Sequence, residues 1–74
     1  MKKNQIVEKN PEVLSGTPVF KGTRVPVQTL IDYLKAGETI ESFLEGFPSV
    51  SRALVEAFLQ IAFESALDLD ARAA

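Results

Sequence analysis

The sequence predicts a mainly α-helical domain with a small N-terminal β-hairpin, built as a single unit over residues 1–74. Three observations support this class. Short β-prone pieces separated by turn residues occupy residues 5–24, three apolar repeats of helical period occupy residues 26–67, and no linker or internal repeat divides the chain. A chain of this length forms one domain, whose core is marginal because small domains bury a small fraction of their surface.

Residues 5–24 are predicted to form the hairpin. Ile6 and Val7 are a β-prone pair, and a second short strand is expected over residues 18–21. Turn signals stand at Asn10-Pro11, Ser15-Gly16 and Gly22-Thr23. Two short strands are barely stable by themselves, so they need a helix to lie on or the strands of a second copy to pair with. The sequence leaves both arrangements open.

The first helix is expected to begin at Pro26, because proline suits the first helical position, where its missing N–H costs nothing. Gly37 is expected to end this helix as a left-handed C-terminal cap. Apolar residues recur between these points at the spacing i, i+3, i+4 and i+7, at Val27, Leu30, Ile31 and Leu34. The sequence therefore predicts one amphipathic helix here.

The second helix is predicted to be short. Thr39 is a good N-cap, and Pro48 cannot be accommodated in a continuation of the helix. The apolar positions are Ile40, Phe43, Leu44 and Phe47. Either Ser49 or Ser51 caps the helix that follows.

The third helix is predicted from about Arg52 to Leu67, with a short, flexible, acidic tail over residues 68–74. Apolar residues cover most of its circumference, which is typical of a helix buried on more than one side. One side can pack on the first two helices, and we assign the other to a second subunit or partner. The predicted interface residues are Val19, Phe20, Val55, Leu59, Phe63 and Leu67.

The chain contains no Cys and no His. Their absence removes disulfides, the common transition-metal ligands, the usual base near neutral pH and the usual soft nucleophile. We therefore expect neither an enzyme nor a cofactor or metal site. Self-association is the remaining way to support so small a core. No apolar run reaches the length of a membrane span and no signal peptide is evident, so a cytoplasmic protein is expected.

The net charge of −2 conceals an asymmetry. Six basic and three acidic residues through position 35 give +3, whereas two basic and seven acidic residues from position 36 onward give −5. A basic half suggests an anionic partner and an acidic half a cationic one. Ordinary solvated surface is the alternative.

A short helix, a turn and a longer helix, preceded by another helix, match the layout of a helix-turn-helix domain. In that geometry Ser49, Ser51 and Arg52 would reach base edges or phosphates, and Lys21 and Arg24 would add phosphate contacts. A plain three-helix bundle produces the same pattern. Arg24 also has a structural interpretation, which we favour: its planar fork could hold backbone carbonyls or a carboxylate at the strand-to-helix corner.

The order of motifs resembles the bacterial and archaeal domain-of-unknown-function family 433. The matching elements are Asn10-Pro11, the glycine-led strand from Gly16, Lys21-Gly22-Thr23-Arg24, Pro26-Val27, Ala36-Gly37 and Phe47-Pro48-Ser49. Their order and spacing hold from Ile6 to about Ala62. One departure is Ser51-Arg52-Ala53 at the start of the third helix, where many relatives carry acidic residues.

The resemblance implies a β-hairpin followed by a three-helix, homeodomain-like bundle that is commonly a dimer. It also implies a VapB-type antitoxin, paired with a PIN-like ribonuclease toxin and able to bind its own operator DNA, with no active site. The function expected from the sequence is therefore a homodimeric antitoxin and DNA-binding autoregulator. The alternative is a protein-interaction or dimerisation module without a DNA role.

Overall fold

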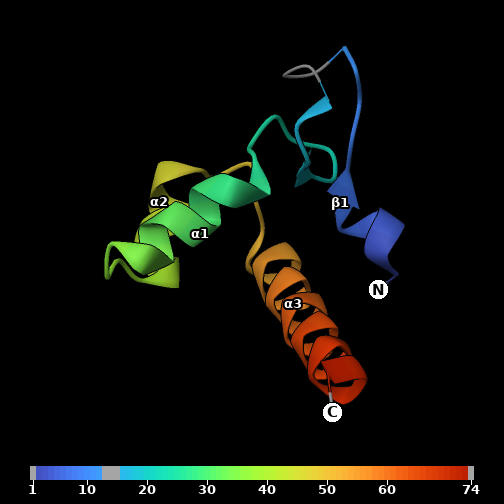
Figure 1. Cartoon of the computed structure of the whole chain (residues 1–74). Helices are drawn as coiled ribbons and strands as arrows, with labels where there is room; N and C mark the ends of the chain where they lie inside the picture. The colour runs from blue at the N-terminus through green and yellow to red at the C-terminus, as the bar shows by residue number, and fades with distance from the viewer. Residues whose placement is uncertain (1, 13–15, 74) are drawn as a thin grey trace.

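A computed structural model describes residues 2–12 and 16–73, with residues 69–73 described by their backbone. A short 3-10 helix η1 comes first, and two strands and three α-helices follow it (Figure 1). The elements are η1 (Lys3–Gln5), β1 (Val7–Glu8), β2 (Val19–Phe20), α1 (Val27–Lys35), α2 (Ile40–Gly46) and α3 (Arg52–Ala73). The predicted fold class, mainly helical with an N-terminal antiparallel hairpin, is confirmed.

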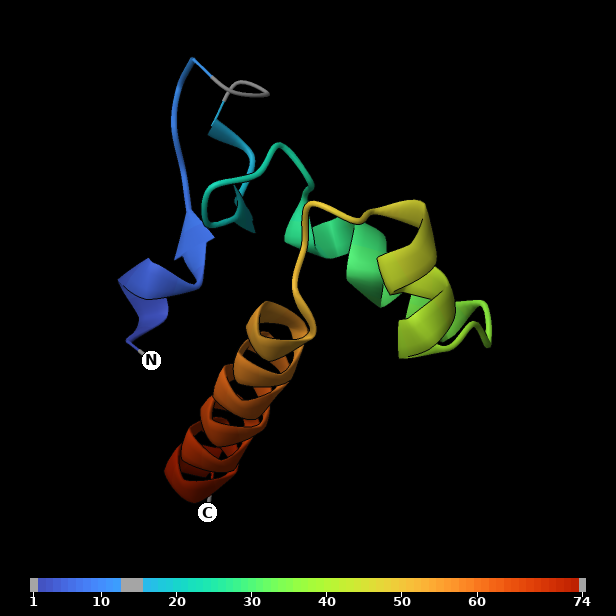
Figure 2. The ribbon, with the colours of Figure 1, turned by 180° about the vertical axis from the view of Figure 1, so that it is seen from behind.

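The helices do not run together along their full lengths. α1 and α2 lie side by side, the hairpin lies on the other side of the molecule, and α3 runs away from both toward the C-terminus (Figures 1 and 2). The first half of α3 therefore belongs to the packed body, and the second half projects from it. No helix among the described residues is long and apolar enough to cross a membrane.

The hairpin pairs within one chain. Val7 stands opposite Phe20 and Glu8 opposite Val19, in antiparallel register. The backbone N–H of Lys21 donates to the Ile6 carbonyl at 2.8 Å, which extends the pairing beyond the strands. The strand predicted over residues 18–21 is confirmed at its centre, whereas the first strand begins at Val7, one residue later than predicted. The helix η1 was not predicted, and the turn expected at Ser15 lies outside the described residues.

The turn after β2 explains the Lys-Gly-Thr-Arg motif in structural terms. Gly22 has φ +77°, a conformation that L side chains rarely adopt. The hydroxyl of Thr23 donates to the Phe20 carbonyl at 2.8 Å and accepts from the backbone N–H of Val25 at 3.1 Å. The turn closes when the N–H of Phe20 donates to the Val25 carbonyl at 3.0 Å. The motif thus folds the strand back toward α1.

The boundaries of α1 follow from its caps. Pro26 is the N-cap rather than the first helical residue, because its backbone is extended (φ −62°, ψ 139°) and bridges to Val19. At the other end Gly37 has φ +85° and its N–H donates to the Leu34 carbonyl at 3.0 Å. The N–H of Glu38 donates to the Tyr33 carbonyl at 2.9 Å, which completes a Schellman cap. Gly37 therefore ends α1 as predicted.

Hydroxyl side chains cap the two later helices. Thr39 accepts from the backbone N–H of Ser42 at 3.0 Å, which confirms it as the N-cap of α2. Ser51 accepts from the N–H of Leu54 at 3.1 Å, so Ser51 rather than Ser49 caps α3. α3 was predicted to end near Leu67, but it continues to Ala73 through most of the segment expected to be a tail. No Gly or Pro interrupts residues 68–73, and the alanines and the one leucine of this stretch favour helix.

The core draws on every part of the chain between the hairpin and α3. Phe20 lies near its centre, with its ring centroid 6.1 Å from Phe43 and 5.7 Å from Phe58. The buried apolar residues are Ile6, Val19, Phe20, Val25, Leu30, Phe43, Val50 and Val55. Val19, Phe20 and Val55, which we predicted to lie in an interface, are covered by the chain's own packing.

Candidate functional site

Lys21, predicted to contact phosphate, is engaged by an acidic residue of the facing strand. Its ammonium lies 3.6 Å from a carboxylate oxygen of Glu8, and the other oxygen of Glu8 accepts from the backbone N–H of Gly22 at 3.0 Å. Glu8 thus joins β1 to the turn after β2. The sequence did not point to Glu8, because only the register of the hairpin brings it opposite that turn.

Arg24 is exposed at the strand-to-helix corner. No hydrogen bond or ion pair joins it to any residue in the described part of the chain. The clamp that we favoured from the sequence is therefore wrong, because the hydroxyl of Thr23 satisfies the turn instead. Of the predicted DNA-contacting cations, Arg24 is the one whose charge is not already compensated by a described carboxylate.

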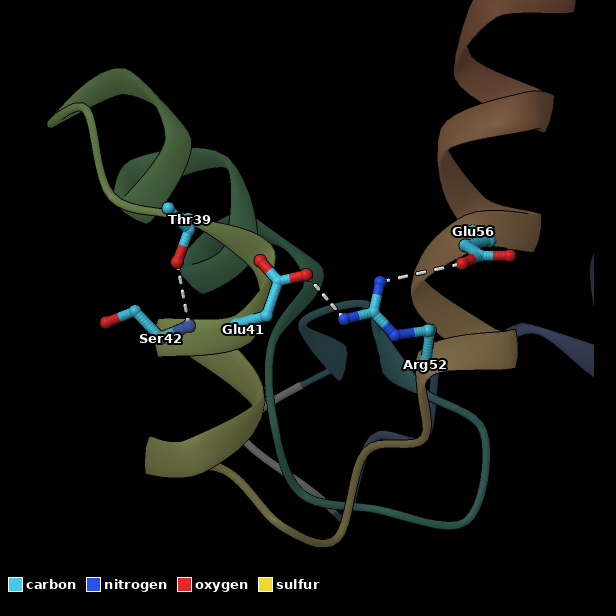
Figure 3. A network of polar contacts seen from close by, with 5 residues as sticks. All are labelled: Thr39, Glu41, Ser42, Arg52 and Glu56. Carbon is cyan, nitrogen blue, oxygen red and sulfur yellow. Dashed lines mark hydrogen bonds and ion pairs between the residues drawn. The ribbon is translucent and has the colours of Figure 1, made fainter.

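Arg52 bridges two helices at the start of α3 (Figure 3). One guanidinium nitrogen donates to Glu41 of α2 at 2.6 Å, and another lies 3.7 Å from Glu56 one turn further along α3. Ser49, Ser51 and Arg52 do lie together at the entry to α3, but Ser51 is occupied as its cap. Of the two serines, Ser49 is exposed without a cap role. The predicted base-reading group therefore carries one cation between two carboxylates.

The hydrogen bond from Arg52 and its positive charge lower the pKa of Glu41 below its ordinary value. The same hydrogen bond and attraction raise the pKa of Arg52. Because the folded-state pKa of Glu41 is depressed, whatever stability the pair adds is present above the ordinary carboxyl pKa. It is lost as the pH falls through the lowered value. At neutral pH both groups stay charged, and the pair helps to set α3 against α2.

The far half of α3 presents exposed apolar side chains. Phe63 is 57% exposed and Leu67 is 53% exposed, one helical turn apart. Leu59, one turn before Phe63, is partly buried against the core. Of the six predicted interface residues, these three remain on a surface that a partner can reach.

The acidic half of the chain carries exposed glutamates on α2, on α3 and in the turn before α2. Its described glutamates are all exposed, and they are Glu38, Glu41, Glu45, Glu56 and Glu64. Among the described ion pairs, Arg52 is the cation that contacts these glutamates, and it pairs with Glu41 and Glu56. The exposed glutamates make this half net negative, whereas the exposed cations Lys2, Lys3, Lys9, Lys21, Arg24 and Lys35 lie in the N-terminal half.

Comparison with known proteins places this arrangement in a family. Residues 7–62 match the family described as "Protein of unknown function (DUF433)", which is most of the chain. The chain belongs to the DUF433 family. The DUF433 match covers the hairpin, α1, α2 and the first half of α3, and it ends one residue before Phe63.

A longer curated protein is similar to this chain over part of its length. The uncharacterized protein y4eO of Sinorhizobium fredii (strain NBRC 101917 / NGR234) is 46% identical over 46 residues, which is 62% of this chain and 21% of the relative. The match thus spans about a fifth of the length of that relative. No solved structure matches the chain.

Proposed function

We propose that this DUF433 chain is the antitoxin-type member of a two-protein pair and binds a basic protein partner through its acidic half. The observation that carries the proposal is the set of exposed glutamates on α2 and α3. Opposite potentials across an interface steer association and select partners. The family resemblance, which implies a VapB-type antitoxin, supports the same conclusion.

A cationic toxin of the PIN-like ribonuclease class is the partner that we expect. Such an enzyme handles a polyanionic substrate, so it carries a basic surface that an acidic protein can cover. An inhibitor of this kind acts by occupying that surface and needs no catalytic group of its own. We therefore propose that the chain is not an enzyme, in keeping with its lack of His and Cys.

Charge reversal on the acidic half should abolish capture of the partner. The chain is co-expressed with the untagged product of the neighbouring gene, and co-purification is expected for the natural sequence. The double variant Glu45→Lys/Glu64→Lys should lose most of the captured protein, because it converts two exposed acidic positions to basic ones.

The matched control is the double variant Glu12→Lys/Asp32→Lys. It changes the net charge by the same amount at exposed positions in the N-terminal half, and it should retain the partner. Equal capture by all three proteins, or no capture by the natural sequence, would contradict the proposal.

Binding of operator DNA is a second candidate function, and exposed Arg24 favours it. Because Lys21 is already paired with Glu8, reversing the charge of Arg24 should weaken DNA binding more than reversing the charge of Lys21. Fluorescence anisotropy with the chain's own upstream duplex and a scrambled duplex, over a salt series, measures this. Arg24→Glu is expected to reduce the salt slope by about one for each phosphate that the variant no longer neutralises. Weak, equal binding that moderate salt abolishes would leave a module that binds only proteins.

A further inference from the structure

We propose that the turn after β2 is a binding site for a phosphate group of the DNA backbone, and that the chain's own Glu8 competes for it. The proposal rests on the second candidate function, binding of DNA, and deepens it by assigning the site, its ligand and a residue that limits its affinity. The two contacts of the Glu8 carboxylate, the charge around the turn and the exposure of the groups involved carry it.

The turn after β2 presents two donors to one anion. The backbone N–H of Gly22 donates to one carboxylate oxygen of Glu8 at 3.0 Å, and the ammonium of Lys21 lies 3.6 Å from the other oxygen. The two donors belong to consecutive residues, whereas Glu8 is fourteen positions from Gly22 and reaches the turn from β1 (Figure 1). The carboxylate therefore fills a position on which an N–H and a cation converge.

The turn keeps its shape through bonds that do not involve Glu8. The backbone N–H of Thr23 donates to the Phe20 carbonyl at 2.9 Å, and that of Phe20 donates to the Val25 carbonyl at 3.0 Å. The Thr23 hydroxyl adds a bond to each of the same two residues. Closing the turn thus does not use the N–H of Gly22, which is left for the carboxylate or for another anion.

Glu8 is surrounded in the sequence by cations. Residues 2–9 and 16–26 contain η1, both strands and the turn, and Glu8 is the one acidic residue among them. The basic residues of these two stretches are Lys2, Lys3, Lys9, Lys21 and Arg24. Five basic residues and one acidic residue give +4. A DNA backbone carries a regular row of negative charges, so it is attracted to this part of the chain.

The pair of Glu8 and Lys21 is open enough for an external anion to compete with it. The side chain of Lys21 is 53% exposed and that of Glu8 is 33% exposed. Ion pairs in contact with water contribute little to stability, so breaking this one costs little. A phosphate oxygen is negatively charged and accepts hydrogen bonds as a carboxylate does, so it can take the same two donors. Exposed Arg24, three positions beyond Lys21, is available to a neighbouring phosphate.

Occupation by Glu8 limits the affinity of the turn for DNA. A phosphate gains its contacts with Lys21 and Gly22 only as the chain loses its own. Removing the negative charge of Glu8 should therefore free Lys21 for DNA and strengthen binding. If Glu8 served only to hold the turn in place, its charge would not matter to DNA as long as its hydrogen bond were kept.

Fluorescence anisotropy with a scrambled duplex, over a salt series, measures the effect of Glu8→Gln. Glutamine keeps an oxygen that can accept from the Gly22 N–H, but it carries no charge. Glu12→Gln is the matched control, because it removes the same charge from an exposed residue between the two strands. At low salt Glu8→Gln should bind the duplex about threefold or more tightly than Glu12→Gln, with a salt slope steeper by about one for each turn that contacts the duplex.

A second substitution identifies the cation that gains the phosphate. Lys21→Met should cost more affinity in the Glu8→Gln background than in the natural sequence, because the ammonium is unpaired only in that background. In NMR spectra, the backbone amide resonance of Gly22 should shift at a lower duplex concentration in Glu8→Gln than in the natural sequence. Circular dichroism verifies that each variant keeps its helices.

Equal affinities of Glu8→Gln and Glu12→Gln would overturn the proposal. So would a Glu8→Gln variant that binds no duplex, a Lys21→Met effect that is the same in both backgrounds, or binding that leaves the Gly22 resonance unmoved. The operator function is judged by a different comparison, in which the natural sequence must prefer its own upstream duplex to the scrambled one. Either proposal can therefore fail while the other holds.

Discussion

Replacing Phe43 with alanine is expected to destabilise the fold by about 3–5 kcal/mol. Phe43 is fully buried, and its ring centroid lies 6.1 Å from Phe20, 5.6 Å from Tyr33 and 5.0 Å from Phe47. Removing the ring loses its transfer free energy and leaves a cavity where elements from three parts of the chain meet. Marginal stability of about 0.05–0.15 kcal/mol per residue gives a domain of this size little reserve. The variant should therefore be largely unfolded in mild urea.

Urea titration followed by circular dichroism measures this change, at protein concentrations too low for self-association. Phe63→Ala is the control, because it removes the same ring from a side chain that is 57% exposed. Its effect on the free energy of unfolding of the monomer should stay within about 0.5 kcal/mol, as for most surface substitutions. Equal losses at the two positions would show that Phe43 does not organise the core.

Much of the fold could be predicted because local signals act on neighbouring residues. Gly37 ends α1 through a backbone conformation that glycine adopts easily, and Thr39 begins α2 through a bond to a residue three positions on. Such effects are contained in a few consecutive residues. The apolar period likewise identified Leu30 and Phe43 as residues that face the core.

The contacts of the candidate site could not be predicted in the same way, because they join residues that are distant in sequence. Arg52 is separated by eleven positions from Glu41, and only the packing of α3 on α2 brings them to 2.6 Å. Glu8 reaches Gly22 through the register of the hairpin. A cation that looks available in the sequence can thus be paired in the fold, as Lys21 is.

The end of α3 shows a different limit. The sequence indicated a helix apolar around most of its circumference but not how much of it the chain's own body would cover. Val55 and Phe63 are both apolar, yet one is buried and the other exposed, because the body extends along only the first half of α3. Helical periodicity identifies the face of a residue, whereas the length of the contact depends on tertiary structure.

Two leucines of α1 provide the sharpest test of that distinction. Leu30 and Leu34 lie one turn apart on the same predicted apolar stripe, but Leu30 is fully buried and Leu34 is 37% exposed. Leu30→Ala should cost about 2–5 kcal/mol of unfolding free energy, because it creates a cavity in the core. Leu34→Ala should cost less than about 1 kcal/mol, because much of its side chain already contacts water.

Both substitutions change leucine to alanine within one helix, so the small difference in helix propensity is common to the two variants. The difference between their free energies of unfolding, obtained from urea titration, therefore reflects how deeply each side chain is buried. Losses of equal size would mean that Leu34 is covered in solution, by a surface that the single chain does not provide. A gap of at least about 1.5 kcal/mol would show that the core of the isolated chain decides which apolar residues of α1 stabilise the fold.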